Sequence, residues 1–153
     1  MARVFDVSLA PTVTAGGYSD GDVVGGLQTI TIPYVNDVNQ VWLKQVRIRD
    51  DAAAPNVSDM RLHFYSAAPT TIADNAAWAR TDADLAKWVG SVDVTTFVAN
   101  GVVNSSALVT GLSVAIPLLG GVIYMYIEVN DASPPTYSAT NDLVLQLLFS
   151  DEA

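Results

Sequence analysis

Apolar and polar residues alternate along much of this chain, and the alternation predicts β-strands. Apolar side chains recur at every second position in residues 60–65 and again in residues 41–49. Residues 28–35 and 143–149 are rich in β-branched and aliphatic residues, and Pro33 places the first of these segments at an edge or a strand end. About eight short strands with turn residues between them are expected, which is typical of an all-β domain.

The apolar stretch 108–129 is predicted to form a β-hairpin that turns at Gly120-Gly121. Pairing around this turn places Leu118 opposite Ile123 and collects one wholly apolar face, as expected for a sheet packed on a core. A membrane helix is disfavoured because Pro117 and the two glycines interrupt the stretch. Residues 108–129 are therefore assigned to a sheet and not to a membrane.

Two further patterns predict which side chains share a face. Asn100-Gly101 is a strong signal for a two-residue turn, because both residue types tolerate positive φ, and pairing around it sets Val98 opposite Val103. The strand at 41–49 has two distinct faces. One face holds Trp42, Val46 and Ile48, and the other holds Leu43, Gln45, Arg47 and Arg49.

Helix is predicted only once, at residues 81–88, where Thr81 offers a cap and Gly90 a stop. The small and polar residues up to position 21 indicate an extended N-terminal arm, residues 1–21, which could reach roughly 70 Å if fully stretched. Residues 22–153 are predicted to form one two-sheet antiparallel β-sandwich, jelly-roll-like, with one short helix in a long loop. The alternative, an open sheet packed on the helix, leaves too many apolar strand faces uncovered.

The composition excludes several classes of function. The chain has 153 residues, with 16 acidic and 7 basic side chains and a formal charge of -9, which disfavours binding to nucleic acid or to an anionic membrane. It has no cysteine, so it has no disulfide and no thiolate site. Half of the residues are hydrophobic and only 15% are charged, against roughly 25% in an average domain, so the surface is expected to associate with partners.

No group of residues predicts catalysis, a metal or a cofactor. The single histidine, His63, has no nucleophile-elbow pattern beside it and is expected to be a surface or interface residue. Carboxylate pairs at Asp20/Asp22, Asp50/Asp51 and Asp82/Asp84 are interpreted as turn and cap residues. A hard cation normally needs more ligands than one pair, so a structural Ca²⁺ is the less favoured alternative.

The aromatic residues allow two interpretations. Core packing or subunit contact is the more common fate of Trp and Tyr, and a sugar-stacking platform is the alternative. The residues concerned are Trp42, Trp78, Trp88, Tyr124 and Tyr126.

Several blocks of the chain resemble small structural proteins of tailed bacteriophages. The first is Gly17–Gly26, which is similar to a Tyr-x-x-Gly-Asp-Val-(Val/Ile)-Gly run near the N-terminus of those proteins. A Leu-x-Phe strand at residues 62–65 follows, then an Asp-Asn-x-x-aromatic block at 73–78 and an Asp-x-Asp-Leu block at 82–90. The blocks occur in the same order over nearly the whole chain.

This resemblance implies a non-enzymatic virion protein, more readily a head decoration (cement) protein than a tail component. Such a protein is made in the bacterial cytoplasm and binds the major capsid protein on the outside of the capsid, often as a homotrimer. The predicted partner-binding residues of the arm are Arg3, Val4, Phe5, Val7, Leu9 and Tyr18, and those of the loop and helix are Trp78, Arg80 and Trp88. A tail or baseplate component and a carbohydrate-binding jelly roll are the alternatives.

Overall fold

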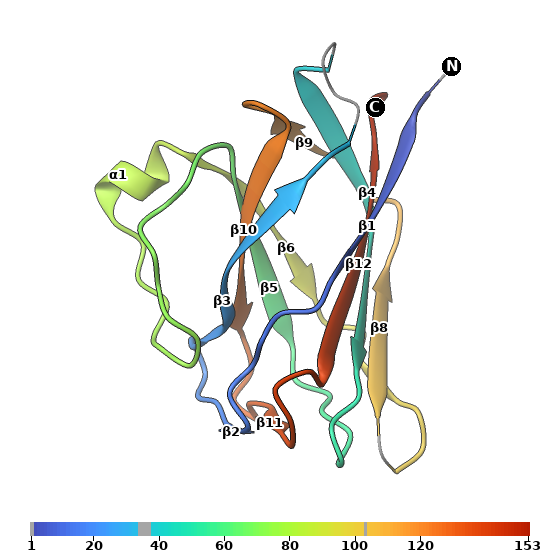
Figure 1. Ribbon diagram of the computed structural model, residues 1–153. Coiled ribbons are helices and arrows are strands. Elements are labelled where there is room, and N and C mark those ends of the chain that lie inside the picture. The colour runs from blue at the N-terminus through green and yellow to red at the C-terminus, as the bar shows by residue number, and fades with distance from the viewer. Residues whose placement is uncertain (1, 34–37, 103) are drawn as a thin grey trace.

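The computed structural model describes residues 2–33, 38–102 and 104–153, which fold into two antiparallel sheets packed face to face (Figure 1). The first sheet contains β1 (Val4–Leu9), β12 (Leu143–Ser150), β4 (Gln40–Asp50), β8 (Ser105–Val109) and β7 (Val98–Ala99) in that order, and β9 (Val114–Pro117) also pairs with β4. The second sheet contains β3 (Val23–Thr31), β10 (Val122–Val129), β5 (Met60–Tyr65) and β6 (Trp88–Val94). β2 (Gly16–Gly17) and β11 (Thr136–Tyr137) form a small separate pair.

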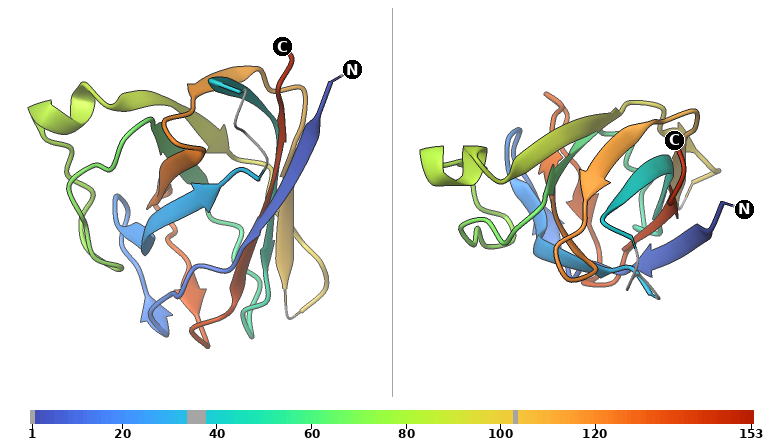
Figure 2. Two further views of the ribbon diagram at one scale, coloured as in Figure 1. Left: turned by 45° about the horizontal axis from the view of Figure 1, so that its top comes forward. Right: turned by 90° about the horizontal axis from the view of Figure 1, so that it is seen from above.

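The order of the strands is that of a jelly roll. The chain crosses repeatedly from one sheet to the other and stays within a sheet only from β5 to β6 and from β7 to β9. Most neighbours within a sheet therefore come from distant parts of the chain, and the view from above shows the two resulting layers (Figure 2). The strands β1-β12-β4-β8 face the strands β3-β10-β5-β6. The predicted all-β, jelly-roll-like sandwich is therefore confirmed.

The core fills the space between the two sheets. Inward-facing residues follow the two-residue period of each strand, so Phe5 lies opposite Phe149 and Val7 lies opposite Leu147 across β1 and β12. The second sheet contributes Ile127 and other aliphatic side chains of β10 to the same core. The apolar faces predicted from alternation are thus the buried ones.

The predicted hairpin at Gly120-Gly121 is wrong in its strand pairing, although the apolar residues predicted to face the core do face it. Both glycines have positive φ and form a turn, but β9 pairs with β4 in the first sheet while β10 pairs with β3 and β5 in the second. The turn carries the chain across the sandwich, and only the bridge between Leu119 and Val122 remains of the expected pairing. The two apolar faces meet through the core instead of within one sheet.

The predicted register around Asn100-Gly101 is also wrong. Val98 pairs with Ser106, and the amide of Asn100 donates to the carbonyl of Asn104 at 2.8 Å, so the connection is longer than two residues. Val98 is 62% exposed and lies outside the core. The predicted partner, Val103, lies outside the described residues, as do positions 34 and 35 of the predicted strand 28–35.

A β-bulge changes the predicted faces of β4. Phe149 pairs with Leu43 and Leu148 pairs with Gln45, so Lys44 is an extra residue that reverses the alternation. Leu43 is consequently fully buried on the same side as Val46, contrary to the sequence-based prediction, and Trp42 turns outward and is only partly buried.

The N-terminal segment differs most from its prediction as an extended arm. Residues 4–9 form β1, which pairs along its whole length with β12, and Phe5, Val13 and Tyr18 are buried in the domain's own core. The amide of Asp151 donates to the carbonyl of Arg3 at 3.2 Å, so the two ends of the chain lie side by side (Figure 1). Burial of Phe5 and a complete ladder to β12 stabilise this placement over a free arm.

Candidate functional site

The two outer faces of the sandwich are unequal, because one of them is covered by the chain itself. Residues 66–87, here called the strap, leave β5, run over the outside of the second sheet and return to β6 (Figure 1). The strap contains α1 (Asp82–Leu85) and most of the residues that the sequence marked as a loop and helix. It is the region where the predicted functional residues come together.

A second apolar cluster lies beneath the strap. Tyr65 and Tyr126 are almost fully buried there with Val23, and their rings meet edge to face at 6.1 Å. The hydroxyl of Tyr126 donates to the carbonyl of Thr70 and accepts from the amide of Ile72, both at 2.8 Å. Burial raises the pKa of Tyr65 to about 12, so both tyrosines are neutral packing residues at physiological pH.

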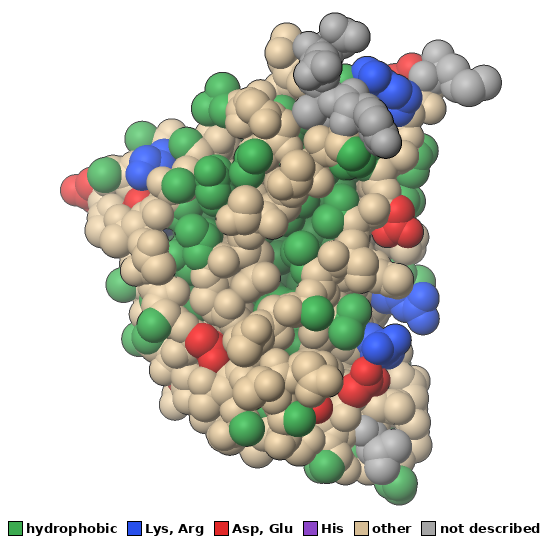
Figure 3. Space-filling view, in the orientation of Figure 1, with side chains coloured by type: hydrophobic (Ala, Val, Ile, Leu, Met, Phe, Trp, Pro, Cys, Tyr) green, Lys and Arg blue, Asp and Glu red, His purple; other side chains and the backbone are tan. Residues whose placement is uncertain are grey.

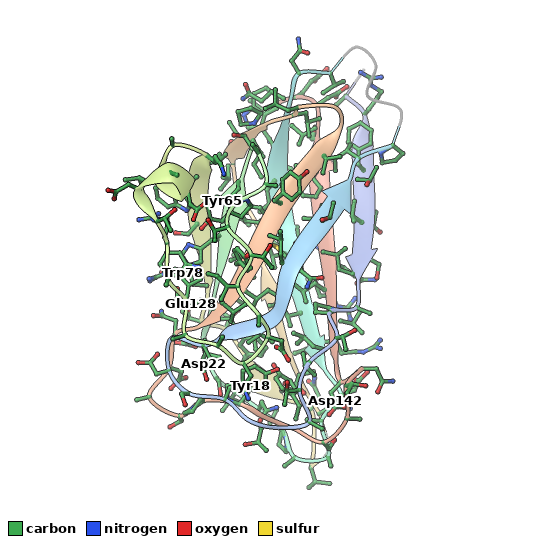
Figure 4. All side chains as sticks on the ribbon, turned by 60° about the vertical axis from the view of Figure 1, so that its left-hand side comes forward. Tyr18, Asp22, Tyr65, Trp78, Glu128 and Asp142 are labelled. Carbon is green, nitrogen blue, oxygen red and sulfur yellow. The ribbon has the colours of Figure 1, made fainter. Side chains whose placement is uncertain are left out.

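His63 is buried beside this cluster, against Trp78, whereas the sequence predicted a surface or interface residue. It is 5% exposed, its Nε2 lies 2.7 Å from Oε2 of Glu128, and its ring stacks on Trp78 with centroids 4.3 Å apart. Figure 4 shows Trp78 and Glu128 at the same level of the covered face. Alternation correctly placed His63 away from the main core, but it could not show that the strap covers that side.

Trp78 and Arg80 of the strap lie close to Trp88, the first residue of β6. The guanidinium carbon of Arg80 lies 5.4 Å from the ring centre of Trp78 and 4.7 Å from that of Trp88. The exposed Arg80 therefore lies against two half-buried indoles. With Trp78 also stacked on His63, these rings are engaged in packing, which counts against a sugar-stacking platform.

Asp74 fastens the N-terminal segment to the strap. Its carboxylate accepts from the hydroxyl of Tyr18 at 2.7 Å, the hydroxyl of Thr14 at 2.6 Å and the amide of Gly25 at 2.5 Å. Burial and the hydrogen bond to Asp74 raise the pKa of Tyr18. Tyr18 is thus a structural residue of this domain and, at 5% exposed, presents little surface to a partner.

Backbone pairing joins the same two segments. The amide of Val23 donates to the carbonyl of Ala76 at 2.8 Å, and the amide of Trp78 donates to the carbonyl of Gly21 at 2.7 Å. Gly25 adopts φ +73, and a Cβ there would lie 2.4 Å from Cβ of Pro11, which explains why glycine occupies this position. The blocks 17–26 and 73–78, which carry the resemblance to phage proteins, therefore form one packed unit.

Asp84 closes the other end of the strap through a capping box. Thr81 and Asp84 exchange side-chain-to-backbone hydrogen bonds at the start of α1, and the Asp84 carboxylate also accepts from the amide of Thr70 at 2.8 Å. These hydrogen bonds, that of the Thr81 hydroxyl first among them, hold the pKa of Asp84 well below its usual range. The helix is shorter than the predicted 81–88, because Trp88 begins β6.

The predicted arm residues are spread over different environments. Phe5 and Tyr18 are buried, Val7 and Leu9 are half-buried against the core, and only Arg3 and Val4 are exposed. Arg3 donates to the carboxylate of Asp151 at 2.7 Å, which holds it on the domain. Of the six residues, Val4, at 62% exposure, offers the most free apolar surface.

At least one member of each carboxylate pair serves the fold. Asp22 accepts from the amide of Ser19 in a turn, and Asp50, which is fully buried, accepts from the amide of Ala52 and from Asn56 at 2.9 Å. Burial raises the pKa of Asp50. Among the described residues, no group of three or more His, Cys, Asp or Glu side chains is placed to hold a metal ion. The described segments also contain no helix with the length and hydropathy needed to cross a membrane.

One surface was not identified from the sequence, the outside of the first sheet. In the described part of the chain, no segment comparable to the strap covers it. Its outward residues include Arg47 and Arg49 of β4, Leu108 of β8 and Leu148 of β12. In Figure 3 most blue side chains gather along the margin formed by this sheet. The polar alternation of residues 45–49 contained the signal, because it placed two arginines on a single outward face.

Comparison with known proteins gives no family for this chain. No protein-family model matches it, and no curated protein matches it in sequence. A chain in the X-ray structure of tomato aspermy virus is similar over 97% of this chain and 76% of that chain, with 11% identity and a TM-score of 0.45. A chain of Desmodium yellow mottle tymovirus is similar over 98% of this chain and 86% of its own, with 11% identity and a TM-score of 0.33. At these TM-scores the likeness carries no argument about function.

Proposed function

We propose that this chain is a non-enzymatic structural protein of a virion, and specifically a decoration protein that binds the major capsid protein on the outside of a phage head. The observation that carries the proposal is the packed unit around Asp74. Blocks 17–26 and 73–78, which resemble phage structural proteins, are far apart in sequence but share hydrogen bonds through Tyr18 and Gly25. The residues that resemble phage proteins therefore contact one another in the fold. Blocks that were similar only by chance would have no reason to lie together.

The chemistry of the covered face supports a structural role over catalysis. His63 and Glu128 are close enough for proton transfer, but His63 is buried and its ring is stacked on Trp78. A general base must reach a substrate within hydrogen-bond distance, and the strap occupies that side of the ring. A jelly roll alone does not decide function, since capsid proteins and lectins both use it.

The proposed contact residues follow from exposure. Val4, at the start of β1, remains a proposed contact, whereas Phe5 and Tyr18 are withdrawn because they are buried in the domain. On the strap, Arg80 is the exposed member of its group and the proposed contact there. Assembly as a homotrimer on a repeating shell would multiply weak contacts into strong overall binding.

The test is quantitative mass spectrometry of purified virions of the source phage, separated into heads and tails. A copy number close to that of the major capsid protein in heads is the expected result. A small copy number confined to tails would instead identify a tail or baseplate component. Absence from both fractions would contradict the proposal in every form.

A further inference from the structure

The outer surface of the first sheet differs from the rest of the molecule in charge. It is here called the open face and centres on Arg47, with Arg49, Leu108, Leu148, Val4 and Trp42 around it. Four of the seven cationic residues of the chain, Arg3, Lys44, Arg47 and Arg49, lie on β4 or next to β1. Asp151 and Asp51 neutralise Arg3 and Arg49, and the exposed Asp6 lies beside Leu148 on the same face. Lys44 and Arg47 are therefore the two of these four cations that form no ion pair with the described residues.

The open face combines charge with exposed apolar area. Arg47 lies opposite Leu108 on one side and Gln146 on the other, and Leu108 is 52% exposed. Val4 at the sheet edge is 62% exposed. Arg49 is paired with Asp51 at 2.9 Å, whereas Arg47 forms no ion pair with any of the described residues. A partner for this face therefore needs carboxylates that can reach Arg47.

Such carboxylates gather at one end of the second sheet, here called the acidic end and formed by Asp20, Asp22, Asp59, Asp93 and Asp131. Backbone hydrogen bonds hold the segments together, from Gly21 to Val129 and from Asn130 to Asp59, each at 2.9 Å. The amide of Asp59 donates to the carboxylate of Asp131 at 2.9 Å, so these two aspartates lie close together. Burial and repulsion by Asp131 and Asp93 raise the pKa of Asp59.

One cation, Arg61, neutralises part of the acidic end through Asp93 at 2.5 Å. The side chains of Asp20 and Asp59 form no hydrogen bond or ion pair with the described residues. A second positive partner would relieve the repulsion that Asp59 experiences. The open face of another copy offers one in Arg47.

We propose that the open face of one copy binds the acidic end of a second copy of this chain. The two surfaces belong to different sheets, so the contact is heterologous, and repetition closes a ring or continues into a lattice. Charge selects the partner and the apolar residues around Arg47 supply buried area. The contact is one between copies and does not depend on the place of the protein in a virion.

The experiment is sedimentation velocity of the full chain at low and high salt, with charge-reversed variants. The first variant is Arg47→Glu, and the second combines Asp20→Lys with Asp59→Lys. Arg80→Glu serves as the matched control, because it makes the same change at an exposed arginine of the strap, away from both surfaces and without an ion pair to the described residues. Circular dichroism of each variant establishes that it is folded.

The wild type is expected to associate at about 20 mM salt and to dissociate at about 500 mM, where the screening length is short. Each reversed variant alone should weaken association by about tenfold or more, while the Arg80→Glu control associates as the wild type does. Mixing the two reversed variants should restore pairing, because the intact acidic end of the Arg47→Glu copy meets the intact open face of the other copy. Growth beyond pairs in the mixture then requires the new glutamate to meet the new lysines.

Two results would overturn the inference. One is a wild type that remains monomeric at about 100 µM in low salt, a concentration that detects even weak contacts. The other is association that Arg47→Glu leaves unchanged, or that the mixture of variants fails to restore. A monomeric wild type found in phage heads would reject this contact and leave the proposed function in place.

Discussion

Replacing Asp74 with alanine tests whether the N-terminal segment and the strap stabilise each other. The substitution removes the common acceptor for three donors, the hydroxyls of Thr14 and Tyr18 and the amide of Gly25. Tyr18 is buried, so its hydroxyl cannot fully recover hydrogen bonds from water. The variant is therefore expected to lose stability although no core side chain changes.

The expected loss is about 2–4 kcal/mol. A hydrogen bond to a charged group contributes about 1.5–3 kcal/mol when buried, but the bond from Thr14 is exposed and contributes less. Asp74→Asn keeps one oxygen acceptor and the side-chain shape, so it should lose roughly half as much. Asp20→Ala is the control, because Asp20 is an exposed aspartate in the same part of the chain.

Urea unfolding followed by circular dichroism measures these differences. The midpoint of Asp74→Ala should fall with little change in the slope if the domain still unfolds as one unit. A loss below about 0.5 kcal/mol, or one equal to that of Asp20→Ala, would refute the reasoning, since typical surface substitutions stay within that range. In that case the hydrogen bonds of Asp74 would be replaced by water at no net cost.

Three other expectations follow from the same geometry. Gly25→Ala should lower the free energy of unfolding in urea by about 3 kcal/mol or more, because a Cβ there meets Pro11. Gly120→Ala, also at positive φ but in open space, should lower it by only about 1 kcal/mol, and equal losses would contradict the steric explanation. The pKa of Asp84 is lower in the folded state than in the unfolded chain, so the carboxylate stabilises the fold fully above its unfolded pKa and less as the pH falls. In thermal melts below about pH 4, the difference in melting temperature between the wild type and Asp84→Asn should therefore shrink. Trp78→Ala removes the ring that stacks on His63, so trypsin should cleave the strap several times faster than in the wild type, as measured by mass spectrometry of the fragments. An unchanged cleavage rate would mean that the stacking of Trp78 on His63 does not hold the strap in place.

Alternation predicted which side chains are buried better than it predicted which strands are neighbours. Gly120-Gly121 illustrates the difference, because the apolar residues on either side of the turn are buried in the same core although they lie in different sheets. Either arrangement, a hairpin in one sheet or a crossing between two sheets, buries the same residues. Local patterns cannot distinguish them, since the choice depends on β4, which is distant in sequence and accepts β9 as its neighbour.

The first strand was missed although its signal was present. Phe5, Val7 and Leu9 alternate with polar residues, as in the strands that were recognised, but the small residues that follow favoured the interpretation of an arm. The bulge at Lys44 could not be predicted, because a single extra residue has no signature in a sequence that remains apolar on both sides. The burial of His63 depends on the strap, which shows no periodicity.

The positions that resemble phage proteins and the positions proposed to bind partners lie in different places. Tyr18, Gly25 and Asp74 are engaged within the molecule, so substitutions there should act through folding. The open face around Arg47 contains none of the resembling blocks. Because the strap covers the outside of the second sheet, the outside of the first sheet is the broad surface left for contact. Residues on that surface can be substituted without disturbing the packed unit around Asp74. Partner choice in proteins of this design should therefore follow β4 and β8 together with exposed strap residues such as Arg80, whereas substitutions in the resembling blocks should act through the stability of the fold.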